Sequence, residues 1–231
     1  MTEQTKRALC IGINDYPGIG SDLAGCIADA TDWGKFLERK GFVVKTILDK
    51  QATGEAIVSD LKLLVSQGIP GDTLVIQYSG HGTQVPDTNG DESDKLDEAW
   101  VPYDVWENGP VLDDTIWKIL RSKQPAVKII FISDSCHSGS VVRAFNAPHE
   151  GKRKFIPFEK CMGPKALEQF ASKGIVDFIM TRAGKPFVVE ESEKVPWPCL
   201  LLAGCQDNEY SYDANFDGKA NGAFTYWALK L

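Results

Sequence analysis

Residues 128–139 read Lys-Ile-Ile-Phe-Ile-Ser-Asp-Ser-Cys-His-Ser-Gly. An apolar, mostly β-branched run that ends abruptly in small and polar residues is typical of a buried parallel strand reaching the edge of an open α/β sheet. The side chain that this strand brings to the edge is Cys136. The stretch therefore predicts a mainly parallel sheet with a cysteine at the carboxyl end of one strand.

Residues 72–82 have the same pattern and read Asp-Thr-Leu-Val-Ile-Gln-Tyr-Ser-Gly-His-Gly. They predict a second buried strand, followed by a turn in which two glycines flank His81. If the two strands are neighbours, their ends lie about 4.8 Å apart. A cysteine nucleophile needs a nearby base, and His81 can supply one. A buried cysteine and a turn histidine are more often structural, but the polar residues after Cys136 and the glycines around His81 favour catalysis.

Apolar periodicity elsewhere predicts alternating strands and helices, which indicates one α/β domain over residues 1–231. Further strands are expected at residues 7–14, 42–48 and 198–205, the last of them buried, and helices at 23–40, 53–68, 113–120 and 222–231. Two segments lack this pattern. Residues 83–97 are expected to form a polar loop, and residues 146–194 an exposed insertion with little core of its own.

The composition is that of a globular protein, with 43% hydrophobic residues and a net charge of −7. The negative charge argues against a nucleic acid or an anionic membrane as partner, and no apolar run is long enough to cross a bilayer. The six cysteines form no CxxC pair, and the amino terminus lacks an apolar signal core. A reducing cytoplasm is therefore expected.

The motifs Tyr78-Ser-Gly-His-Gly82 and Asp134-Ser-Cys-His-Ser-Gly139 resemble the two catalytic motifs of metacaspases and their bacterial relatives, the orthocaspases. These are caspase-like cysteine peptidases. The similarity extends to Gly25-Cys-Ile-Ala-Asp29 and to Ala203-Gly-Cys-Gln-Asp207. The resemblance implies a caspase-like three-layer sandwich with a mainly parallel central sheet, in which residues 146–194 link a large and a small part.

The same resemblance implies the chemistry. His81 and Cys136 would form a catalytic dyad, and the backbone N–H groups of Gly82 and Cys136 would hold the oxyanion. The substrates would be peptides or proteins cut after arginine or lysine, and the enzyme is expected to be a monomer.

A pocket for a basic side chain is expected beside the dyad. Asp134 precedes Cys136 by two residues, so strand alternation places both side chains on one face. Asp29 lies on the helix expected after the first strand. Two carboxylates would hold a guanidinium through charge-assisted hydrogen bonds worth about 1.5–3 kcal/mol each. The resemblance adds Ser79 and Cys26 to this pocket.

A calcium site is a weaker expectation. Ten carboxylates between residues 87 and 114 face one lysine, so this region attracts cations. The resemblance matches Asp97, Asp113 and Asp114 to calcium ligands, but Arg143 stands where a further aspartate is needed. A guanidinium there removes an oxygen ligand and adds a positive charge. We expect a weak or absent calcium site, with Arg143 pairing with the aspartates and no cofactor required.

The segment Gly151-Lys-Arg-Lys154 is an expected self-cleavage site, since an enzyme that cuts after basic residues can cut its own exposed basic loop. Cleavage is predicted after Arg153 or Lys154, with Lys160 and Lys165 as alternatives. Two other functions remain open, a catalytically quiet signalling or scaffold module and a calcium-binding regulatory domain. The dyad and the pocket together favour the peptidase.

Overall fold

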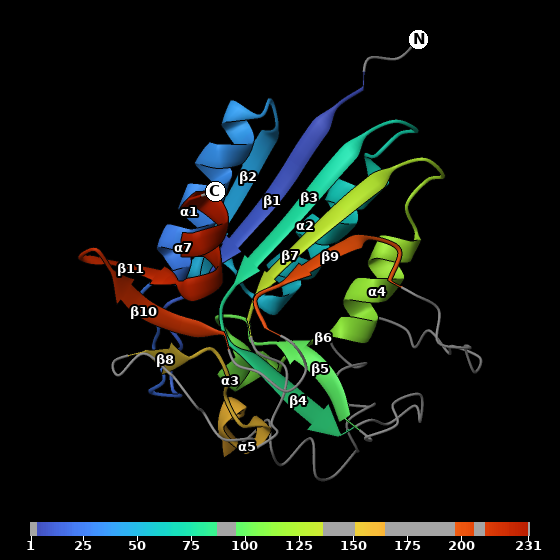
Figure 1. The fold of residues 1–231 in the computed structure, drawn as a ribbon. Coiled ribbons are helices and arrows are strands. Elements are labelled where there is room, and N and C mark those ends of the chain that lie inside the picture. Colours follow the sequence, from blue (N-terminus) through green and yellow to red (C-terminus); the bar gives the residue numbers. More distant parts are fainter. Residues whose placement is uncertain (1–3, 87–95, 136–150, 165–196, 206–210, 231) are drawn as a thin grey trace.

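The computed structural model of the chain describes residues 4–86, 96–135, 151–164, 197–205 and 211–230. Its centre is a sheet of five parallel strands in the order β2-β1-β3-β7-β9 (Figure 1). The strands are β1 (Lys6–Gly12), β2 (Val43–Leu48), β3 (Thr73–Ser79), β7 (Lys128–Asp134) and β9 (Leu200–Ala203). The two strands that carry the motifs, β3 and β7, are adjacent, which meets the condition set for bringing their ends together.

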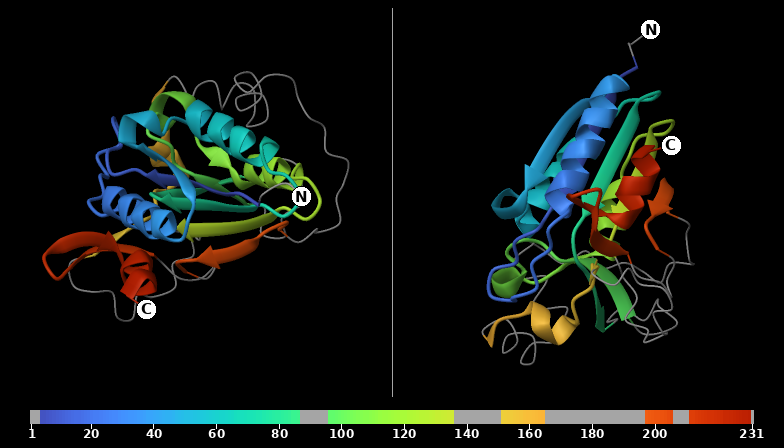
Figure 2. Two further views of the ribbon diagram at one scale, coloured as in Figure 1. Left: turned by 90° about the horizontal axis from the view of Figure 1, so that it is seen from above. Right: turned by 60° about the vertical axis from the view of Figure 1, so that its left-hand side comes forward.

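Helices cover both faces of this sheet, which confirms the three-layer α/β sandwich (Figure 2). One face carries α1 (Cys26–Arg39) and α7 (Ala223–Lys230), which contact each other. The opposite face carries α2 (Gly54–Ser66) and α4 (Asp113–Arg121), which also contact each other. Within the described residues, no helix combines the length and the apolar character needed to cross a bilayer.

Side-chain alternation along the central strands explains the two layers. Ala8 and Cys10 of β1 point to one face, where they pack with Trp33 of α1. Leu9 and Ile11 point to the other face, where they join the larger core cluster beneath α2 and α4. Because both faces are covered, the strand reads as a continuous apolar run.

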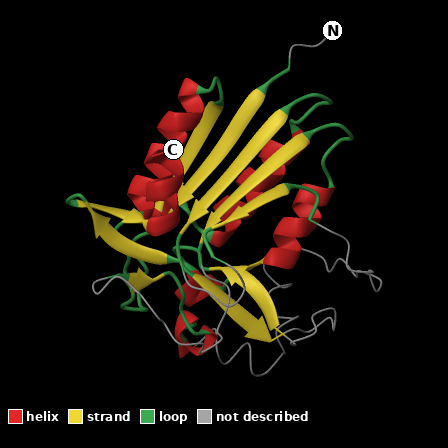
Figure 3. Ribbon diagram, in the orientation of Figure 1, coloured by secondary structure: helices red, strands yellow, loops and turns green. Residues whose placement is uncertain are grey.

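Smaller elements gather at the carboxyl ends of the parallel strands (Figure 3). One three-stranded sheet has the order β4-β5-β6 and another the order β11-β10-β8. The remaining elements are β4 (Gly82–Pro86), β5 (Leu96–Trp100), β6 (Val111–Leu112), β8 (Lys152–Arg153), β10 (Tyr212–Phe216), β11 (Lys219–Gly222), η1 (Asp49–Gln51), α3 (Val105–Asn108) and α5 (Phe158–Cys161). This end of the sheet carries the candidate site.

One expectation about loops was wrong in part. The predicted polar loop 83–97 includes most of β4 and the start of β5, which pair antiparallel and so satisfy each other's backbone groups. Residues 87–95 lie outside the described residues. The polar stretch before α7 forms the β10–β11 hairpin, whose turn residues Asp217 and Gly218 have φ of 54° and 82°. Asp-Gly is the usual sequence for such a turn.

Two expectations about burial were also wrong. The apolar run 198–205 contains β9, but Leu200 is 59% exposed, because β9 is last in the strand order of the sheet. The insertion 146–194 was expected to have little core, yet within residues 151–164 the side chains of Ile156, Cys161 and Met162 are buried. This segment is therefore packed against the domain.

Gly12 sets how closely α1 approaches the sheet. A Cβ atom at Gly12 would lie 2.4 Å from the Cys26 carbonyl oxygen and 2.9 Å from the Ala30 Cβ. We predict that Gly12→Ala lowers the free energy of unfolding by about 1–3 kcal/mol, measured by urea denaturation, because α1 must move outward. Gly34→Ala is the matched control. Its Cβ would meet Thr46 Oγ1 at 3.5 Å, an ordinary contact, so a gain of up to about 1 kcal/mol is expected. Equal stability of Gly12→Ala and the wild type would contradict the close approach.

Candidate active site

The backbone of His81 is fixed by two tyrosines. Its N–H donates to the Tyr16 hydroxyl at 2.7 Å, and its carbonyl accepts from the Tyr78 hydroxyl at 2.7 Å. The preceding residue, Gly80, lies between these hydroxyls, and a Cβ there would be 2.6 and 2.7 Å from them. Only glycine allows this close approach, as the sequence pattern indicated.

The imidazole of His81 is oriented by a backbone carbonyl. Its Nε2 lies 2.6 Å from the Ser21 carbonyl oxygen, which can only accept, so Nε2 carries the proton. The other nitrogen, Nδ1, is buried and has no hydrogen-bond partner among the described residues. In the neutral ring Nδ1 therefore holds a free lone pair. That is the form needed in a general base.

Burial lowers the pKa of His81 from 6.5 to about 4. The positive charges of Lys154 and Lys152 contribute to this lowering, and the hydrogen bonds to the backbone of Ser21 and of Lys154 oppose it. The imidazole is therefore neutral at pH 7 while these cations are near.

The expected nucleophile, Cys136, lies outside the described residues, as does Arg143. The register of β3 and β7 pairs Ser79 with Asp134, and the next described residue, Ser135, is the last before Cys136. The chain thus reaches Cys136 from the strand adjacent to the one that precedes His81. The adjacency of the strands is confirmed; the dyad itself remains a prediction.

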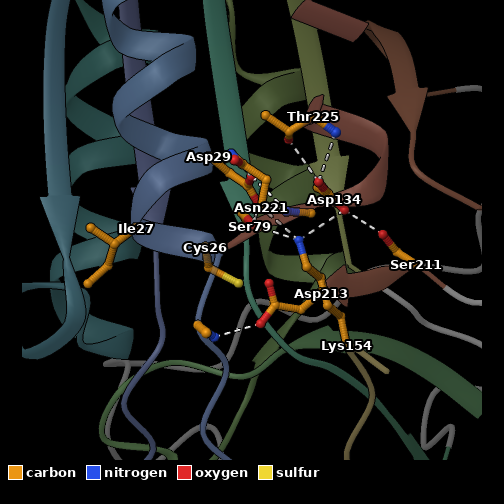
Figure 4. Close-up of polar contacts among 12 residues, drawn as sticks. Cys26, Ile27, Asp29, Ser79, Asp134, Lys154, Ser211, Asp213, Asn221 and Thr225 are labelled. Carbon is orange, nitrogen blue, oxygen red and sulfur yellow. Dashed lines mark hydrogen bonds and ion pairs between the residues drawn. The ribbon is translucent and has the colours of Figure 1, made fainter. Parts of the chain in front are cut away.

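The four residues expected to form the basic-residue pocket lie together and are buried, as Figure 4 shows. They are Cys26 and Asp29 of α1, Ser79 of β3 and Asp134 of β7. Burial raises the pKa of the Cys26 thiol well above its ordinary value, so this thiol is neutral. The charge of the pocket comes from its carboxylates.

Lys154 fills this pocket. Its ammonium lies 3.0 Å from Asp29 Oδ2, 3.1 Å from Asp134 Oδ1 and 2.9 Å from Ser79 Oγ. Burial by itself would lower the pKa of Lys154, but the carboxylates of Asp134 and Asp29 outweigh it and hold that pKa well above its ordinary value. The lysine was expected on an exposed loop, and that was wrong: a buried ammonium is stable here because the pocket pairs it.

Residues near the carboxyl end of the chain hold the two carboxylates in place. Gly222 N–H donates to Asp29 at 2.8 Å, and Asn221 Nδ2 donates to it at 3.1 Å. Asp134 accepts from the Thr225 hydroxyl at 2.8 Å and from the Ser211 hydroxyl. Sequence reasoning missed these partners, because no spacing in residues 206–225 indicates which polar side chains turn inward.

The floor of the pocket requires a glycine. A Cβ at Gly222 would lie 2.2 Å from Asp134 Oδ2 and 2.3 Å from Lys154 Nζ. Any side chain at this position would occupy the space of the bound ammonium. The cavity that accepts a cation therefore exists because residue 222 has no side chain.

The backbone around Lys154 is extended and paired on both sides. The Lys154 carbonyl accepts from Gly82 N–H at 2.9 Å, and its N–H donates to the Ser211 carbonyl at 3.1 Å. Ile156 N–H donates to the Gly82 carbonyl at 3.0 Å. Ahead of Lys154, β8 pairs antiparallel with β10. The bond between Lys154 and Phe155 is thus held next to the expected oxyanion donor, Gly82.

The acidic residues that the resemblance matches to calcium ligands, Asp97, Asp113 and Asp114, lie on β5 and at the start of α4. Burial, with the charges of Glu98, Asp114 and Asp97 adding to it, raises the pKa of Asp113 to about 8. Asp114 pairs with Lys118 at 2.8 Å. Within the described residues, no group of three or more carboxylate, cysteine or histidine side chains is arranged to hold an ion.

Comparison with known proteins gives a consistent family. A family model for the metacaspase peptidase C14 domain matches residues 6–145. The chain is 33% identical to metacaspase-1 of Cryptococcus neoformans, over 96% of this chain and 54% of that protein. It is also 33% identical to metacaspase-1B of Aspergillus clavatus, over 97% of this chain and 61% of that protein. The chain thus spans little more than half the length of these relatives.

A solved structure supports the fold. A crystal structure of a protein from Geobacter sulfurreducens superposes with a TM-score of 0.75 at 31% identity. The superposition covers 98% of this chain and 81% of that one. Nearly the whole chain therefore follows the same architecture.

The low pKa of His81 makes a prediction about stability. A pKa of about 4 in the folded state, against 6.5 in the unfolded state, means that the folded state resists protonation. The stability linked to this neutral ring is fully present above pH 6.5 and is lost as pH falls through 4, by about 3 kcal/mol. In urea unfolding at pH 7 and pH 4, His81→Gln should lose correspondingly less stability than the wild type. Parallel pH profiles for the two proteins would contradict the buried neutral imidazole.

Proposed function

The chain belongs to the metacaspase family, whose members are cysteine-type peptidases, and on that premise we propose that it cleaves peptide bonds after arginine or lysine with a dyad of Cys136 and His81. One observation carries the proposal. The ammonium of Lys154 is held by Asp29 and Asp134 while its carbonyl rests on Gly82 N–H. A basic residue that precedes a cleaved bond needs both contacts.

The pocket explains why a basic side chain would be chosen. An unpaired charge in a buried site is unfavourable by several kcal/mol, so a cation enters only where fixed carboxylates compensate it. Asp29 and Asp134 are held by backbone and side-chain donors before any substrate arrives. An aspartate or glutamate side chain would be repelled by the same two carboxylates, and a neutral one would leave them unpaired.

The catalytic steps follow from the groups at the ends of β3 and β7. His81 Nδ1 takes the proton of the Cys136 thiol, and the sulfur attacks the carbonyl carbon after the basic residue. The backbone N–H groups of Gly82 and Cys136 stabilise the oxyanion. When the carbon–nitrogen bond breaks, His81 returns the proton to the leaving amine. Water, deprotonated by His81, then cleaves the thioester and restores the thiol.

The enzyme would process itself between Lys154 and Phe155. Of the candidate cleavage residues, Lys154 is buried in the pocket, whereas Arg153 and Lys160 are exposed and Lys165 lies outside the described residues. In the uncut chain Lys154 occupies the pocket, so another substrate can bind only after Lys154 leaves. Self-cleavage would free the carbonyl end of this segment.

Calcium would not be required. The cluster of Asp97, Asp113 and Asp114 needs compensation, as the raised pKa of Asp113 indicates. Arg143 would provide it as a guanidinium in place of a metal ion. The substrates would be peptides or proteins, and the enzyme would act as a monomer in the cytoplasm without a nucleic-acid or membrane partner.

The activity is tested with fluorogenic peptides that end in arginine, lysine or aspartate. We predict cleavage after arginine and lysine only, unchanged by excess chelator, because Arg143 compensates the carboxylates. Cys136→Ala should reduce kcat/KM by more than about a thousandfold. A strict calcium requirement would refute the role of Arg143. No cleavage under any condition, calcium included, would favour a scaffold module.

Self-processing is tested by sequencing new amino termini after incubation of the purified protein. We predict a new terminus at Phe155 in the wild type and in Arg153→Gln, since Arg153 is outside the pocket. Lys154→Gln removes the paired ammonium, and we predict at least about tenfold slower cutting, as for the loss of one charged interaction. Cys136→Ala should stay intact. A terminus at residue 154, or cutting that Lys154→Gln does not slow, would contradict the choice of Lys154.

A further inference from the structure

A third carboxylate, that of Asp213, lies at the same pocket. Asp213 is on β10, paired with Lys152 of β8 on one side and with Gly222 of β11 on the other. It is 4% exposed, and Figure 4 shows its carboxylate beside Cys26 and the side chain of Lys154. Sequence analysis did not place Asp213 at the pocket.

One oxygen of Asp213 has no hydrogen bond. Its Oδ2 accepts from Ala24 N–H at 2.6 Å, whereas Oδ1 is buried without a partner among the described residues. Oδ1 faces the backbone of Gly25, where a Cβ would lie 2.2 Å from it, but no donor among the described residues meets it with hydrogen-bond geometry. Burial raises the pKa of Asp213, and the hydrogen bond from Ala24, the charge of Lys154 and the nearby Gly25 backbone only partly oppose this. A buried acceptor left without a donor needs an explanation.

The lysine in the pocket cannot supply the missing donor. An ammonium has three N–H groups, and those of Lys154 are directed to Asp29, Asp134 and Ser79. An arginine side chain is longer and has five N–H groups in a planar fork. If the guanidinium donates one hydrogen bond to each of the same three acceptors, two of its N–H groups remain without a partner. The unpaired oxygen of Asp213 is at the pocket wall that they would meet.

We propose that Asp213 is a specificity-determining residue that makes the pocket select arginine over lysine in substrates. The inference rests on the proposed function, since it concerns the pocket for the residue before the cleaved bond. It also accounts for the residue at position 154. Because a lysine leaves Asp213 unpaired, Lys154 binds the pocket less tightly than the arginine of a substrate would. After self-cleavage an arginine substrate can therefore displace the segment that carries Lys154.

The test compares matched peptides with arginine or lysine before the cleaved bond, using the self-cleaved full chain. In the wild type the kcat/KM for arginine should exceed that for lysine by about tenfold or more, as for one hydrogen bond to a charged group. Asp213→Asn keeps an oxygen for Ala24 N–H but presents an amide to the pocket. In Asp213→Asn, the ratio of kcat/KM for the arginine peptide to kcat/KM for the lysine peptide should fall towards one. Asp60→Asn is the matched control, because it removes the same charge from a partly exposed residue of α2 that pairs with Lys45, away from the pocket. In this control, the ratio of kcat/KM for arginine to kcat/KM for lysine should stay at the wild-type value.

A binding measurement separates this inference from the proposed function. In full-length Cys136→Ala/Lys154→Ala, which cannot cut and has lost its own lysine, calorimetry measures the affinities of Nα-acetyl-arginine amide and Nα-acetyl-lysine amide. The arginine compound should bind about tenfold tighter, and adding Asp213→Asn should abolish the difference. If no peptide is cleaved but this preference holds, the peptidase function fails and the inference stands. If peptides are cleaved but Asp213→Asn changes neither the kcat/KM ratio nor the affinity ratio of arginine to lysine, the inference is overturned.

A second variant covers the case in which Asp213→Asn does not fold. In the Cys136→Ala chain, Lys154→Arg places a guanidinium in the pocket from within. We expect it to raise the melting temperature, since Asp213 gains a donor. A fall in melting temperature would overturn the proposal, because the pocket would then be built for an ammonium.

Discussion

The ammonium of Lys154 between Asp29 and Asp134 connects more of this protein than any other described contact. A buried charge requires partners with good geometry, because its desolvation is unfavourable by several kcal/mol. Here the partners come from α1 and from β3 and β7 in the central sheet, and the groups that orient them come from β11 and α7. Residues from nearly the whole length of the chain must be in place before the ion cluster is satisfied.

The two carboxylates that pair with Lys154 are also held by other groups of the protein. Asp29 and Asp134 each accept hydrogen bonds from groups that do not move with the ligand, including Gly222 N–H and Thr225. Fixed carboxylates in a water-poor site attract a cation more strongly than mobile ones at a surface. A structural ion pair alone would explain the side-chain contacts of Lys154. The backbone of the same segment is held separately, since the Lys154 carbonyl accepts from Gly82 N–H and the preceding β8 pairs with β10.

The histidine and the pocket are linked through this same lysine. The charge of Lys154 adds to burial in lowering the pKa of His81, and departure of the lysine would remove that contribution. The imidazole is thus least readily protonated while Lys154 is in place. The two tyrosines that clamp the His81 backbone, Tyr16 and Tyr78, keep its position independent of what the pocket holds.

The sequence by itself determined the parallel sheet and the strands that precede His81 and Cys136, because apolar runs and turn glycines are local signals, and the motifs' resemblance to metacaspases pointed to Cys26, Asp29, Ser79 and Asp134. Only the tertiary structure decided which base nitrogen is free, since the Ser21 carbonyl that orients His81 is remote in sequence. It also decided that Lys154 is buried, that Asp213, Asn221 and Thr225 surround the pocket, and that β9 is exposed. These features depend on pairings between distant segments, and charged or polar residues in loops carry no periodic signal that says which of them turn inward.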